Sequence, residues 1–258
     1  MRRLLSLAAA LGAALALASC GSGGTRPAPP PPQGPPSARH PAAEIDAALA
    51  GEEMRAHLIS ASRLYFNGLF KFAADHMATV QQQYAAISPA VRSRDDALDR
   101  EFHAAFGVIS GQIGRRLPAP VVMNRMGLMQ GQLLDAAIAD SVTAPAQNDP
   151  GVTAEVIVRL AEQGARSYSL AASEGFTDRG KRAYQDAFGL IARADTLSHR
   201  ISAALGPQSS RVTNALDDAH NVGFATGIRA PRKMPAQRVS ADVQRARAGI
   251  ARRFGFTA

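Results

Sequence analysis

Acidic residues precede four of the histidines by about one helical turn, a spacing that suits metal binding. The pairs are Glu53/His57, Asp99/His103 and Asp195/His199 at four residues, and Asp217/His220 at three. Residues three or four apart share a face of a helix, and helical bundles bind divalent metals with carboxylate and imidazole ligands. Two interpretations remain open: a metal site between helices, or acid–histidine pairs that stabilise the surface of each helix.

The most regular of these patterns is a row in which Asp95, Asp99 and His103 follow one another at intervals of four residues. On a helix, this row would present two carboxylates and one imidazole along a single face. We therefore take these three residues as candidate metal ligands with oxygen and nitrogen donors.

Three methionines form a second candidate metal site. Met123, Met126 and Met129 are spaced by three residues, and clustered thioethers bind soft cations such as copper(I). Met126 and Met129 also fall in phase with Leu133 and Ala136, which is typical of a buried helical face. The alternative is that the methionines only fill the hydrophobic core.

The remaining reactive residues do not form a known catalytic set. Cys20 is the only cysteine, and the chain contains no G-x-S-x-G elbow, no glycine-rich phosphate loop and no H-E-x-x-H motif. His76 continues the apolar edge of its segment, so we expect a partly buried histidine satisfied by a hydrogen bond. These observations favour a non-enzymatic protein without a cofactor.

Apolar residues recur at helical spacing through most of the chain, whereas no convincing alternating strand pattern occurs. We expect a helix over 43–87, with Gly51 and Gly68 as candidate breaks, and a second helix from Ser88-Pro89 to Pro118. Further helices are predicted at about 120–140, from Asp149-Pro150 to 174, from Thr177 or Asp178 to 205, and more weakly at 209–222. The sequence thus predicts an all-α fold, an irregular bundle of five or six amphipathic helices over residues 43–227.

Positive charge is concentrated at the C-terminus, where residues 228–258 carry eight basic residues and one acid. We expect a basic tail with a short amphipathic helix that begins after Ser240 as N-cap and ends at Gly255. Its arginines are candidates for contact with an anionic lipid, lipopolysaccharide or an acidic envelope protein: Arg245, Arg247, Arg252 and Arg253. The alternative is a disordered, solubilising tail.

The N-terminus has the layout of an export signal. Arg2 and Arg3 precede an apolar run over 4–17, and Leu17-Ala18-Ser19-Cys20 follows. This segment resembles the lipobox of bacterial prolipoproteins. The resemblance implies that residues 1–19 are removed, that Cys20 is acylated with fatty acids such as palmitate, and that the acyl chains anchor the protein to a membrane.

Two further features refine this expectation. Gly21 follows the cysteine where aspartate would favour retention at the inner membrane, so the chain resembles lipoproteins of the outer membrane that face the periplasm. Residues 20–42 are rich in proline and glycine, which predicts a disordered tether. An envelope location argues against nucleic acid as a partner. We therefore expect a membrane-anchored binding or scaffold protein, with a metal-binding or metalloenzyme bundle as the alternative.

Overall fold

The computed structural model describes residues 39–229 and 234–256, and within these ranges the chain forms helices and no strands. The all-α prediction is therefore confirmed. The predicted signal segment, the lipobox with Cys20 and nearly all of the tether lie outside the described residues. The helices are α1 (Ala42–Phe66), α2 (Phe70–Arg94), α3 (Asp96–Gly114), α4 (Ala119–Leu128), α5 (Leu134–Ser141), α6 (Ala144–Gln147), α7 (Pro150–Glu174), α8 (Asp178–Arg200), α9 (Ser202–Leu205), α10 (Ser209–Gly223) and α11 (Ala236–Phe254), with a π-helical turn (Met129–Leu133) joining α4 to α5.

The helix predicted within 43–87 is two antiparallel helices, α1 and α2. The chain reverses at Gly68, which has a positive φ of 75°, and the Leu69 amide donates to the Leu64 carbonyl at 2.9 Å. This backbone conformation favours glycine, which confirms the candidate break at Gly68.

The candidate break at Gly51 is wrong, because Gly51 lies buried inside α1, packed against Ile138. The predicted helix start at Ser88-Pro89 is wrong, because Pro89 lies inside α2. The next helix instead begins at Asp96.

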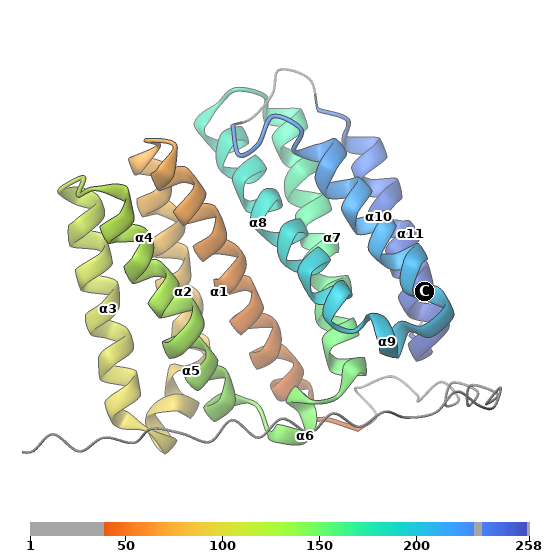
Figure 1. The fold of residues 1–258 in the computed structure, drawn as a ribbon, viewed down its shortest axis with the longest axis horizontal. Helices are drawn as coiled ribbons and strands as arrows, with labels where there is room; N and C mark the ends of the chain where they lie inside the picture. Colours follow the sequence, from red (N-terminus) through yellow and green to blue (C-terminus); the bar gives the residue numbers. More distant parts are fainter. Residues whose placement is uncertain (1–38, 230–233, 257–258) are drawn as a thin grey trace, which may run out of the picture. The chain divides into compact units, whose positions relative to one another are not determined.

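Two groups of helices meet at α1. Figure 1 shows α1 beside α2, with α3 beyond α2, and α8 on the other side of α1 next to α7 and α10. One continuous hydrophobic core runs through both groups. Its largest fully buried side chains include four tyrosines, and the hydroxyls of Tyr168 and Tyr184 both donate to the Gly223 carbonyl. These bonds join α7 and α8 to the end of α10.

The C-terminal helix belongs to the bundle. α11 begins at Ala236, not after Ser240, and it packs against α10 and α7. Val239, Val243 and Ile250 are each at most 1% exposed, so they supply an apolar face that a solvated tail would lack. The expected boundary at residue 228 therefore does not separate a bundle from a tail, although the predicted C-cap at Gly255 is confirmed by its left-handed conformation.

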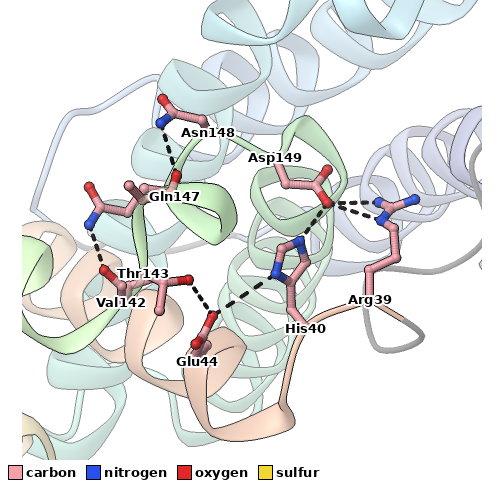
Figure 2. Close-up of polar contacts among 9 residues, drawn as sticks. Arg39, His40, Glu44, Val142, Thr143, Gln147, Asn148 and Asp149 are labelled. Carbon is pink, nitrogen blue, oxygen red and sulfur yellow. Dashed lines mark hydrogen bonds and ion pairs between the residues drawn. The ribbon is translucent and has the colours of Figure 1, made fainter.

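Polar contacts attach the start of α1 to the corner between α6 and α7 (Figure 2). Asp149 accepts hydrogen bonds from Arg39 at 2.8 Å and from the Gly151 amide at 2.7 Å, and it lies 2.9 Å from His40 Nε2. On the neighbouring turn, Glu44 accepts a bond from Thr143 at 2.9 Å. Asp149 is thus the N-cap of α7, as predicted, and also the residue that holds the described N-terminal end in place.

Candidate metal centre

Two histidines and one aspartate from three helices converge inside the bundle. His57 lies on α1, His76 on α2 and Asp186 on α8. The Nδ1 atoms of the two histidines are 3.0 Å apart, and Asp186 Oδ1 lies 3.5 Å from His57 Nδ1 and 3.6 Å from His76 Nδ1. The three donor atoms therefore form a compact and nearly equilateral triangle.

The packing of α8 on α1 brings the aspartate to the histidines. Gly189, one turn after Asp186, lies against the Ala56 carbonyl so closely that a Cβ atom at this position would clash with it. Beside this contact, the Ser60 hydroxyl donates to the Gln185 carbonyl at 2.8 Å. Because glycine lacks a side chain, the two helix backbones can approach closely enough for residues on both to share one site.

The triangle matches one face of a tetrahedral metal site. Ligand atoms bound to zinc at about 2.0–2.1 Å in tetrahedral geometry lie about 3.3–3.5 Å from one another. The observed separations of 3.0, 3.5 and 3.6 Å bracket that spacing. An ion placed slightly off the plane of the donors would therefore reach all three without a change in the positions of the helices.

Burial sets the charge of the donors. It lowers the pKa of His57 to about 4 and that of His76 well below its ordinary value, and the neighbouring His57 adds to the latter effect. Both imidazoles are thus neutral at pH 7, which is the form that binds metals. Burial also raises the pKa of Asp186 to about 6, against the opposing influence of Arg182, so this carboxylate is ionised at pH 7.

The site opens to solvent on one side. A cavity of about 320 Å³ is lined by His57 and Asp186 and also by Glu53, one turn before His57 on α1. Burial raises the pKa of Glu53, whose carboxylate accepts a bond from Gln83 at 3.2 Å. Three protein ligands with an open position are typical of metal sites that keep an exchangeable water or substrate.

Gln185 is the residue before Asp186 on α8, and its side chain lies near His76. His76 Nε2 and Gln185 Oε1 are both buried without a hydrogen-bond partner among the described residues. A metal-binding histidine commonly donates its second N–H to such an outer acceptor. Gln185 is therefore a candidate acceptor for the second nitrogen of His76.

The predicted row of ligands has structural roles instead. Asp95 caps α3, since its side chain accepts a bond from the Leu98 amide at 2.9 Å. Asp99 is 2% exposed and accepts bonds from three side chains, those of Tyr84, Ser88 and Arg92. His103 is half exposed and lies 3.8 Å from Asp99. The structure therefore does not bring these three residues together as free donors.

The positions of the three methionines agree with the alternative interpretation, in which they fill the hydrophobic core. Met126 is fully buried, Met129 is 1% exposed, and both belong to the hydrophobic core. The Met126 sulfur accepts a bond from the Ser62 hydroxyl at 3.3 Å, and Met123 is half buried. This arrangement is typical of core packing.

One acid–histidine pair and the acid of another form a second, more exposed cluster. Asp195, His199 and Asp217 offer donor atoms within 4.8 Å of one another, and burial together with the Asp217 charge raises the pKa of Asp195 to about 6. The side chains of His199 and Asp217 are 56% and 43% exposed. One imidazole and two carboxylates at a surface are also the composition of an ordinary ion-pair network, so the buried cluster is the better candidate.

Three of the four candidate C-terminal arginines have partners within the chain. Arg245 pairs with Asp242 and Asp218, Arg247 with Glu162 at 2.9 Å, and Arg253 donates to the Ala204 carbonyl at 2.6 Å. Arg252 is exposed. The three arginines with partners, which the sequence suggested for contact with an anionic partner, therefore bond to residues of α11 itself and of the elements around it.

Sequence reasoning missed two members of the buried centre. His76 carried a usable signal, because a histidine on an apolar face must find a polar partner when the face is buried. Asp186 carried none, since it has no histidine one turn away. The sequence suggested His57 only as one member of the Glu53/His57 pair, and at 7% exposure it is buried and not part of a surface pair.

Comparison with known proteins adds no family. No protein family, no curated protein and no solved structure matches the chain. Within residues 39–229 and 234–256, no helix has the length and apolar character needed to cross a membrane.

Proposed function

We propose that this chain is a lipid-anchored protein of the bacterial cell envelope whose helical bundle binds a divalent transition-metal ion with His57, His76 and Asp186. The observation that carries the metal assignment is the triangle of donor atoms, with edges of 3.0, 3.5 and 3.6 Å. The lipid anchor on Cys20 rests on the lipobox resemblance alone. The scaffold role and the anionic contact of α11 stay predictions.

The donor set selects the class of metal. Two imidazole nitrogens and one carboxylate oxygen suit zinc and its neighbours, whereas magnesium and calcium prefer sites made of oxygen ligands. The triangle fits tetrahedral coordination. Zn²⁺ is therefore the expected ion, with a water molecule from the cavity at the fourth position.

Metal titration of the purified full-length chain in detergent tests this proposal. We expect one Zn²⁺ per chain, measured by competition with a chromophoric chelator. His76→Asn and Asp186→Asn should each lower the affinity at least about tenfold, because each removes one of three protein ligands. The matched control is His199→Asn, which changes the exposed cluster and should leave the affinity unchanged.

Two outcomes would overturn the assignment. One is a wild-type chain that takes up no zinc, and the other is a control whose affinity falls as far as that of the ligand variants. Thermal unfolding of the metal-free proteins shows whether each variant is folded. If His76→Asn does not fold, Asp186→Asn decides the question, since the Asp186 side chain is 27% exposed and less involved in packing.

A further inference from the structure

A second cavity, of about 460 Å³, lies between α1, α5, α7 and α8. Part of its wall is apolar and includes Ile138, Val142 and Val156. It shares no lining residue with the cavity beside His57 and Asp186. A volume in this range is typical of a site for a small molecule.

The polar part of the wall carries an excess of positive charge. Three arginines line it, Arg55 from α1 and Arg193 and Arg200 from α8, against the two carboxylates of Glu52 and Asp135. Arg193 is 8% exposed. Arg193 is paired with Glu52 and Arg55 with Asp135, so the unbalanced cation is the exposed Arg200. The net positive charge of the wall favours a negatively charged ligand.

The buried arginines keep unused hydrogen-bond donors. Arg193 binds Glu52 through Nε, and this is its only hydrogen bond to the described residues. Arg55 uses its terminal nitrogens on Asp135 and on the Gln130 carbonyl, whereas its Nε, 3.5 Å from the Glu52 carboxylate, is buried without a hydrogen-bond partner among the described residues. Glu52 therefore orients two guanidinium groups while leaving the terminal nitrogens of Arg193 free.

Arg200 supplies the third cation at the rim. It is the last residue of α8 and is exposed, and it forms no ion pair within the described part of the chain. A cation at a helix C-terminus is stabilised by the helix dipole, so this position tolerates an unpaired arginine. It also lies where an entering anion would meet it.

We propose that this cavity binds a small anion through a carboxylate or phosphate group. Arg193 and Arg200 contact the anionic oxygens, because the planar guanidinium fork matches both groups. Arg55 contributes its unpartnered Nε, and the apolar wall contacts the carbon skeleton of an organic ligand. This site does not depend on the metal centre.

Calorimetric titration of the full-length chain in detergent tests this inference, after metal has been removed on a chelating resin so that bound metal cannot contribute. The probes are inorganic phosphate and succinate, and the one that binds identifies the group recognised. We expect one site, and Arg200→Gln should weaken binding about tenfold through loss of a charge-assisted contact. Arg193→Lys, which keeps the charge but not the fork, should also weaken it.

The matched control is Arg94→Gln. Arg94 is also the exposed last residue of a long helix, α2, and forms no ion pair within the described part of the chain. The Arg94→Gln variant should bind the probe with the affinity of the wild type. Failure of both probes to bind the wild type would overturn the inference, as would an unchanged affinity in Arg200→Gln or an equal loss in Arg94→Gln. Unfolding curves establish that Arg193→Lys is folded, and Arg200→Gln decides if it is not.

Discussion

Replacing Gly189 by alanine tests whether the contact between α1 and α8 builds the metal centre. The added Cβ would lie 2.9 Å from the Ala56 carbonyl carbon, 2.6 Å from Ser60 Oγ and closer still to the carbonyl oxygen. Carbon atoms in van der Waals contact are about 3.5–4.0 Å apart, so α8 must move away from α1 by roughly 0.6–1 Å. Backbone atoms form the obstacle, and a change of rotamer cannot relieve it.

This displacement acts directly on the donor triangle, because Asp186 lies one turn before Gly189. If Asp186 moves with its helix, its distances of 3.5 and 3.6 Å to the two histidines lengthen by a similar amount. The circle through the three donors then grows from about 2.0 Å to about 2.2–2.4 Å in radius, beyond a zinc–ligand bond of about 2.0–2.1 Å. One ligand is lost, and zinc affinity should fall at least about tenfold.

The same substitution should also lower the free energy of unfolding. Overpacking costs about 1–3 kcal/mol, and the helix propensity gained by alanine returns about 1 kcal/mol. The matched control is Gly111→Ala on α3, where a Cβ meets nothing within 4 Å. That variant should be stabilised by about 0.5–1 kcal/mol and should bind zinc normally.

Urea unfolding and zinc competition on both variants complete this test. Equal stability and equal zinc affinity in the two alanine variants would refute the claim that the close contact at Gly189 positions the site. If Gly189→Ala is destabilised but binds zinc with the affinity of the wild type, the close contact stabilises the fold but does not position the metal ligands.

Three further predictions follow from the burial and charge of single residues. The carboxylate of Asp186 must lose its proton to bind metal, and its pKa is raised to about 6. Zinc affinity should therefore be constant above pH 6 and fall roughly tenfold per pH unit below it. A fall that begins only near pH 4, the pKa of His57, would show that Asp186 is not a ligand. Asp99→Ala should lower the free energy of unfolding by about 2–4 kcal/mol, because the buried hydroxyls of Tyr84 and Ser88 lose their acceptor. It should leave zinc affinity unchanged, and a loss of zinc binding would restore Asp99 as a ligand. Cys20→Ser should release the chain from the membrane fraction of a bacterial host without changing its zinc stoichiometry, and retention in the membrane fraction would contradict the lipid anchor.

Local signals in the sequence were sufficient for much of the fold. Asp149 and Thr177 cap α7 and α8 with their side chains, at the positions where the sequence predicted helix starts. Capping depends on residues within one turn of one another, so a single sequence contains the necessary information. The start predicted at Ser88-Pro89 failed because proline near the end of α2 was taken as a beginning, whereas the packing of Val91 in the core extends that helix to Arg94.

The candidate site depended on contacts that no local signal reports. His57 and His76 are brought together by the turn at Gly68, which the sequence offered only as a candidate break. Asp186 joins them from a helix more than a hundred residues further along the chain, and its position depends on the fit between Gly189 and Ala56. Spacing rules find ligands that share one helix, and they therefore directed attention to Asp95, Asp99 and His103.

A buried histidine pair does not by itself require a metal, since one Nδ1–H can donate to the other Nδ1 at 3.0 Å. This hydrogen bond between the two histidines does not explain the position of Asp186. Its distances of 3.5 and 3.6 Å to the two nitrogens exceed those of good hydrogen bonds, which are about 2.7–3.2 Å. Burial disfavours the charge of this carboxylate, Arg182 only partly opposes that effect, and the carboxylate accepts no hydrogen bond from the described residues. A metal ion at the centre of the three donors accounts for these separations and for the orientation of both imidazoles.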